Sequence, residues 1–184
     1  MTTRVLIAGL GNIFLSDDGF GVEVAARLAA QPHPEWVRVA DYGIRGIHLA
    51  YDLMDGYDAT VLVDTDQRGD VPGTVRLVEI TAEDRAADRA AGDGVLVDPH
   101  GMQPNRVLHL LDSCGGDPGR VLLVGCEPLA LEEGIGLSRP VLAAVDVAVV
   151  LVRQLWDAGP RSLLEQSVSS GTSSLSGPSR RGAP

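Results

Sequence analysis

Basic residues are scarce in this sequence, and all of them are arginine. None of the 184 residues is lysine, and 15 arginines stand against 25 acidic residues, which gives a formal net charge of −10. Nucleic acids and anionic membranes are bound through clusters of positive charge, so a chain of this sign repels both. We therefore expect neither a nucleic acid nor a membrane surface among the partners.

Long apolar runs and cysteine patterns are also missing. No segment has the length and apolarity of a transmembrane helix, and the first apolar run ends at Gly9, too early for a secretory signal. The two cysteines, Cys114 and Cys126, form neither a disulfide framework nor a CxxC site. These features predict a cytoplasmic protein.

Three catalytic or cofactor motifs are absent. Without an HExxH helix the chain does not resemble a zincin, and without a GxSxG elbow it does not resemble a serine α/β-hydrolase. The glycine-rich segment after the first apolar run has Phe14 where a dinucleotide-binding loop has its third glycine. Two adjacent carboxylates in that segment would repel a phosphate and attract a cation.

Strand-like and helix-like segments alternate along the chain, which predicts a single-domain, three-layer α/β sandwich. A mostly parallel, twisted sheet of about five strands would have helices on both faces, with residues 74–80 as an antiparallel edge. The domain is predicted to span 1–158, followed by a disordered Ser/Gly/Pro-rich tail over 159–184. The expected strands are 4–8, 36–41, 59–64, 74–80 and 120–126, and the expected helices are 22–31, 46–54, 103–114 and 138–156, with 81–98 as loop or weak helix.

Acidic residues stand where two of the predicted strands end. Asp17 and Asp18 follow the first strand, and Asp64 closes the third. Ligands of parallel sheets bind beyond the carboxyl ends of the strands, so these carboxylates would come together if the two strands are neighbours. A cation is the simplest way to keep adjacent carboxylates ionised.

A histidine could complete this site. His100 precedes the predicted helix 103–114, and a helix N-terminus favours the neutral imidazole that can bind a metal. Two carboxylates and one imidazole make an incomplete coordination shell that suits zinc, iron, nickel or manganese.

Simpler interpretations exist for each of these residues. Asp17 or Asp18 would serve as a helix N-cap, Asp64 would bind turn amides, and His100 would be a surface turn residue. Asp66 competes with Asp64 for the same place. The pattern alone leaves these alternatives open.

Five motifs in order resemble those of the hydrogenase maturation proteases, the endopeptidases that trim the large subunit of [NiFe] hydrogenases. The resemblance covers roughly residues 4–157, with Tyr42 in place of a glycine and Thr65 in place of the usual alanine. The motifs are GLGNIFLSDDGFGVEVA, Asp41-Tyr42-Gly43…Gly46, VLVDTD…VPGTV, His100 before a helix, and Gly125-Cys126-Glu127-Pro128…Gly134-Ile135-Gly136-Leu137-Ser138.

The resemblance implies that Asp18, Asp64 and His100 contact nickel, and that Asp18 and Asp64 are catalytic, one of them as general base or as metal-positioning group. The nickel would be carried by the substrate, which is the precursor large subunit of a [NiFe] hydrogenase, and the protease would be a monomer. Substrate-binding residues are expected in the glycine-rich loops, namely Gly9, Gly11, Asn12, Asp17, Gly43 and Gly46. Tight turns alone would also explain these glycines.

Two other functions remain open on the same residues. One is a non-catalytic nickel-recognising module or metallochaperone-like protein. The other is a dinucleotide-binding oxidoreductase, which the acidic pair and the missing third glycine disfavour.

Overall fold

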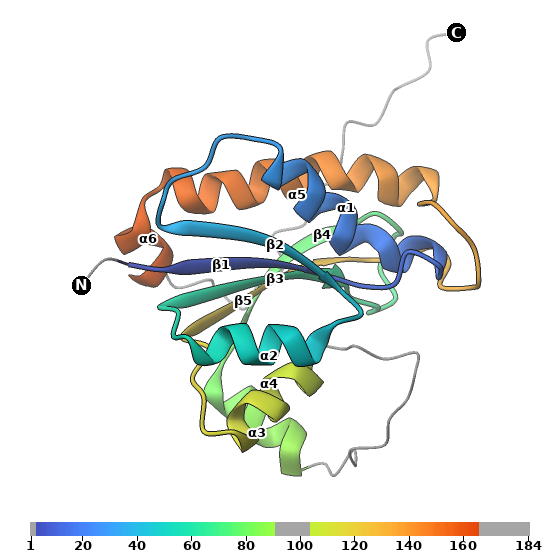
Figure 1. The fold of residues 1–184 in the computed structure, drawn as a ribbon. Coiled ribbons are helices and arrows are strands. Elements are labelled where there is room, and N and C mark those ends of the chain that lie inside the picture. Colours follow the sequence, from blue (N-terminus) through green and yellow to red (C-terminus); the bar gives the residue numbers. More distant parts are fainter. Residues whose placement is uncertain (1–2, 91–103, 166–184) are drawn as a thin grey trace, which may run out of the picture.

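Five strands form one sheet in the order β2-β1-β3-β5-β4 (Figure 1). The structure is a computed structural model that describes residues 3–90 and 104–165. All pairings are parallel except β4 with β5, which is antiparallel, so the predicted α/β class and the antiparallel edge are confirmed. The strands are β1 (Val5–Leu10), β2 (Val37–Gly43), β3 (Ala59–Thr65), β4 (Val75–Ile80) and β5 (Arg120–Cys126).

Helices cover both faces of this sheet. The helices α1 (Phe20–Ala29) and α5 (Arg139–Asp157) lie on one face, and α2 (Gly46–Met54) and α4 (Pro104–Ser113) lie on the other, with α3 (Ala82–Ala90) against α4 (Figure 1). A short 3₁₀ helix, η1 (Ser16–Gly19), precedes α1, so the helical region begins earlier than the predicted residue 22. In the described part of the chain, no helix has both the length and the apolarity to cross a membrane.

Two cores follow from alternation along the central strands. In β1, Val5 and Ile7 face α1 and α5, whereas Leu6 and Ala8 face α2 and α4. The residues of β1 are all buried, because β1 has a neighbouring strand on each side and a helix layer on each face. Such strands have continuous apolar sequences, as VLIAGL shows.

The carboxyl ends of the parallel strands meet at one edge of the sheet. β1 and β3 are direct neighbours, with Ala8 opposite Leu62 and Gly9 opposite Val63. The loop that leaves β1 therefore passes beside Asp64, the next residue of β3. The sequence predicts that the acidic residues come together if the first and third strands are neighbours, and β1 and β3 are neighbours.

The predicted disordered tail does not start at residue 159. A sixth helix, α6 (Pro160–Glu165), follows α5 after a turn at Gly159. Its Leu163 is buried in the core beneath α5, and the Leu163 carbonyl accepts a hydrogen bond from Arg120 Nη1 at 2.7 Å. The ordered domain therefore extends at least to residue 165, because Leu163 reaches the core and its neighbour Leu164 packs against it. Residues 166–184 lie outside the described part of the chain.

Replacing Leu163 by alanine should lower the free energy of unfolding by about 2–3 kcal/mol, the usual cost of truncating a buried leucine. Arg161→Ala is the matched control, since that side chain is exposed on the same helix. Urea unfolding of both variants would measure the difference. Equal stability of the two variants would show that α6 does not dock on the core.

Candidate active site

Asp18 and Asp64 lie together at the carboxyl edge of the sheet, and one residue bridges them. The Thr65 hydroxyl donates a hydrogen bond to Asp18 Oδ1 at 3.1 Å, and the Thr65 backbone N–H donates to Asp64 Oδ1 at 2.8 Å. Gly11 passes directly above the pair, because a Cβ there would lie 3.7 Å from Asp64 Oδ1. The pair occupies the place that the sequence predicted. Its catalytic and metal-binding roles remain predictions.

Asp64 carries an electrostatic cost in this position. Its side chain is only 5% exposed. Burial raises the pKa of Asp64 well above its ordinary value, the negative charge of Asp18 raises it further, and the Thr65 N–H offsets only part of this. A positive charge at this point would stabilise the ionised form.

Asp18 is half-buried and is held by the loop that precedes it. Its Oδ2 accepts a hydrogen bond of 2.7 Å from the Asn12 backbone N–H, while the Asn12 side chain accepts one of 3.0 Å from the Phe14 N–H. The 11–18 loop thus turns back on itself and aims Asp18 at Asp64. Asn12 therefore orders the loop, and its predicted substrate contact stays a prediction.

Asp17 has a different role from its neighbour Asp18. It is completely buried, and its carboxylate accepts hydrogen bonds from three backbone N–H groups, those of Leu129, Ala130 and Ser138, and from the Ser138 hydroxyl, at 2.6–3.0 Å. The predicted substrate contact of Asp17 is therefore wrong, because the side chain is enclosed by its own protein. Nor does Asp17 cap α1. It joins the loop after β1 to the loop after β5.

The ionised form of Asp17 is stabilised despite its burial. Burial alone would raise the pKa of Asp17, but the N–H groups of Ser138, Ala130 and Leu129 and the Ser138 hydroxyl outweigh it, and the net pKa is lowered. Four donors around one carboxylate make it a strong tie between the two loops.

The glycines of these loops allow close packing inside the protein. A Cβ at Gly9 would overlap the Gly21 carbonyl oxygen in α1, and one at Gly11, whose φ is +121°, would overlap the Asp18 carbonyl oxygen. Gly46 is buried where α2 begins. Internal packing accounts for Gly9 and Gly11, and the substrate contacts of Gly9, Gly11 and Gly46 remain predictions. Gly43, with φ of +52°, accepts a hydrogen bond from the Gly11 N–H at 3.1 Å, and its substrate contact remains a prediction.

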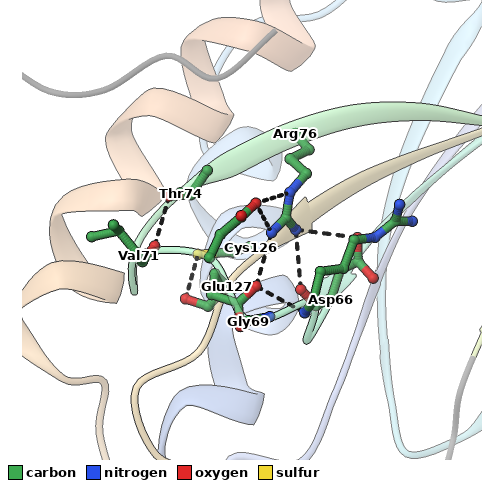
Figure 2. A network of polar contacts seen from close by, with 9 residues as sticks. Asp66, Gly69, Val71, Thr74, Arg76, Cys126 and Glu127 are labelled. Atoms are coloured by element: carbon green, nitrogen blue, oxygen red, sulfur yellow. Dashed lines mark hydrogen bonds and ion pairs between the residues drawn. The ribbon is translucent and has the colours of Figure 1, made fainter. Parts of the chain in front are cut away.

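A buried ionic network, which the sequence did not predict, is centred on Arg76 and Glu127 and includes Asp66, two residues after Asp64 (Figure 2). Arg76 of β4 is 3% exposed and donates to Glu127 Oε2 at 2.8 Å and to the carboxylates of Asp70 and Asp66. Burial alone would raise the pKa of Glu127, but the backbone N–H of Arg68 and then the Arg76 guanidinium outweigh it, and the net pKa is lowered. The network fixes the loop between β3 and β4 against the end of β5.

This network also shows that Asp66, the alternative to Asp64 in the sequence, has a different role. The Asp66 carboxylate pairs with Arg68 at 2.7 Å and with Arg76 at 3.3 Å, and its Cβ packs against Gly125. Asp66 therefore neutralises arginines, whereas Asp64 faces Asp18. The only signal in the sequence was an arginine in a strand that follows an Asp-rich loop.

The described residues supply only part of a metal shell. Within residues 3–90 and 104–165, no group of three or more His, Cys, Asp and Glu side chains is arranged to hold a metal ion. His100 lies outside this part of the chain, so the third ligand remains a prediction. Two adjacent carboxylates fit a divalent cation by charge and donor type, provided that other ligands complete the shell.

Comparisons with known proteins agree on one family. A family model described as hydrogenase maturation protease matches residues 22–154. The Hydrogenase 2 maturation protease of Escherichia coli is 30% identical over 168 residues, covering 90% of this chain and 98% of that protein. The hydrogenase expression/formation protein HupD of Rhizobium leguminosarum is 33% identical over 156 residues, covering 82% and 74%.

Solved structures of similar fold are also hydrogenase maturation peptidases. The hydrogenase maturating endopeptidase HybD from Escherichia coli superposes with a TM-score of 0.69 at 29% identity, covering 85% of this chain and 94% of that one. A hydrogenase 2 maturation peptidase from a Thaumarchaeota archaeon superposes with a TM-score of 0.63 at 32% identity, covering 85% and 99%.

Asp17→Asn should destabilise the fold by about 2–3 kcal/mol at pH 7, because buried donors lose a charged acceptor. The folded-state pKa of Asp17 is lowered, so its contribution is present above the unfolded value near 3.9 and is lost as pH falls through the folded value. Urea unfolding between pH 3 and 7 measures this, with exposed Asp157→Asn as control. A variant as stable as the control at pH 7 would contradict the role given to Asp17.

Asp64→Asn should have the opposite effect and stabilise the metal-free protein. The folded-state pKa of Asp64 is raised, so the ionised carboxylate costs stability at pH 7, and its removal should increase the free energy of unfolding. The gain of the variant should shrink as pH falls through the folded pKa of Asp64 towards about 3.9. Thermal melting of wild type and variant in buffers with a chelator, from about pH 4 to 7, would measure this gain. A variant less stable than wild type at pH 7 would contradict the prediction.

Proposed function

Because this chain belongs to the hydrogenase maturation protease family, whose members are endopeptidases, we propose that it removes the C-terminal peptide from the precursor large subunit of a [NiFe] hydrogenase after nickel insertion. The observation that carries this proposal is the acid pair at the open edge of the sheet. Asp18, in η1 after β1, and Asp64, in β3, both contact Thr65. They lie where two neighbouring parallel strands end, which is where α/β proteins place their ligands.

We propose that the nickel arrives as part of the substrate. Two carboxylates are too few to hold a metal ion firmly, but they suit an ion that already has other ligands. Nickel held by thiolates of the precursor would accept Asp18 and Asp64, with His100 as a third ligand. A precursor without nickel would leave the two carboxylates facing each other uncompensated, so the protein would discriminate loaded from unloaded substrate by charge.

The residues of the chain then have separate tasks. The Asn12 N–H and the Thr65 hydroxyl orient Asp18, and the Thr65 N–H orients Asp64. Either carboxylate can position the nickel or accept the proton of the attacking water, since both are held at the same point. Asp17 holds the loop that carries Asp18 in place from beneath.

A second function is compatible with the same carboxylates, namely a nickel-recognising module without catalysis. It is favoured because the described residues contain no group of three or more His, Cys, Asp and Glu side chains arranged to hold a metal ion. The protein is further proposed to act as a monomer in the cytoplasm. The family resemblance supports a monomer, and the lack of a long apolar run in the sequence supports the cytoplasm.

The proposal is tested by incubating the purified precursor large subunit, with and without nickel, with the wild-type protein and with Asp18→Asn, Asp64→Asn and His100→Ala. Wild type should release the C-terminal peptide only from the loaded precursor, and each substitution should lower kcat by about 100-fold or more. Mass spectrometry of the large subunit gives the readout.

The matched control is Asp157→Asn, an exposed aspartate at the end of α5 that belongs to none of the family motifs. It should cleave like wild type. Binding of the loaded precursor by wild type without any cleavage would favour the recognition module, and cleavage of the nickel-free precursor would contradict the role of the metal.

A further inference from the structure

The loops that carry and support Asp18 form one rigid unit. The Ser16 N–H donates to the Gly134 carbonyl at 3.0 Å, the Gly134 N–H donates to the Phe14 carbonyl at 2.9 Å, and Leu15 pairs with Gly134 in a short parallel bridge. Below these contacts lies the buried carboxylate of Asp17. In Figure 1 the two loops run side by side, one leading into α1 and the other into α5.

Apolar side chains project from this unit into solvent. Phe14 is 61% exposed and Ile135 is 83% exposed, although their backbones are fixed by the contacts around Gly134. Three further apolar residues of the same loops are exposed. We call the five residues the apolar platform: Ile13, Phe14, Leu129, Leu131 and Ile135.

Exposing several large apolar side chains to water is unfavourable, so a group of them on one ordered loop pair calls for a functional explanation. A single exposed leucine is ordinary, but a group of large apolar side chains held in place before any partner arrives is typical of a protein-binding surface. The platform adjoins the acid pair, because Ile13 and Phe14 directly follow Asn12, whose N–H holds Asp18.

The charged side chains within the two loops are all negative, and the first arginine after them is the exposed Arg139 at the start of α5. The two loops, residues 11–19 and 127–138, contain no arginine, and Glu132 and Glu133 are exposed beside Leu131. A second copy of this chain, with its net charge of −10, would bring like charges together. The complementary surface is apolar and flanked by lysine or arginine.

We infer that the apolar platform is the docking surface for the folded precursor, which binds through an apolar segment flanked by basic residues and so brings its C-terminal region over Asp18 and Asp64. This inference rests on the proposed function for the identity of the partner. Asp18 and Asp64 would then bind the nickel of the precursor, while the apolar platform supplies binding energy away from the scissile bond.

The test uses Phe14→Ser, Ile135→Ser and the double variant, with Val150→Ser as control. Val150 is as exposed as the platform residues but lies on α5, about three turns beyond its first residue. Biolayer interferometry on immobilised nickel-loaded precursor gives Kd, and steady-state cleavage gives KM and kcat. Melting temperatures close to wild type would show that all four variants are folded.

The double variant should raise Kd and KM by about tenfold or more, with most of the fall in kcat/KM coming from KM. The Val150→Ser control should match wild type. Because the flanks are charged, the wild-type Kd should also rise as salt increases from about 50 to about 300 mM.

An unchanged Kd and KM in the double variant would overturn the inference while leaving the proposed function intact. Wild type that binds the precursor through the platform without cleaving it would instead overturn the proposed function. A wild-type dimer that the double variant converts to a monomer, measured by light scattering, would show that the platform binds a second copy and would overturn the inference.

Discussion

The buried carboxylate of Asp17 is the interaction on which the rest of the site depends. It accepts four hydrogen bonds from the loop between β5 and α5, and it does so from the residue next to Asp18. Two loops that are more than 110 residues apart in the sequence are thereby fixed to each other. The position of Asp18, the turn of the glycine-rich loop and the exposure of Phe14 all follow from this tie.

Three aspartates of similar sequence context have different physical roles. Asp17 is buried with many donors, so its pKa is lowered and it stabilises the fold. Asp64 is buried beside another carboxylate, so its pKa is raised and it costs stability in the metal-free protein. Asp66 forms ion pairs with Arg68 and Arg76. A residue that lowers the free energy of unfolding, as Asp64 does, is expected where function matters more than folding stability.

Much of this architecture could be predicted from the sequence, because its signals are local. Apolar runs and turn residues located all five strands, and the Asp-rich strand ends located the acid pair. The contacts of Asp17 could not be predicted, since their partners lie more than 110 residues away in sequence and no local pattern distinguishes a buried aspartate from an N-cap. Arg76 has Asp66 and Asp70 within ten residues, but its pairing with Glu127 spans 51 residues and has no local signal. The docking of α6 could not be predicted for a related reason, because two adjacent leucines in a short polar segment give no periodic signal.

The central proposal is that Asp18 and Asp64 reach nickel carried by the precursor. The most direct test is nickel-edge X-ray absorption on loaded precursor, alone and rapidly frozen with an excess of wild-type protein or of Asp64→Asn. We predict additional oxygen or nitrogen scatterers at about 2.0–2.2 Å with wild type and fewer with the variant, by analogy with carboxylate and imidazole bonds to other divalent ions. An unchanged nickel environment in a complex shown to have formed would contradict the proposal.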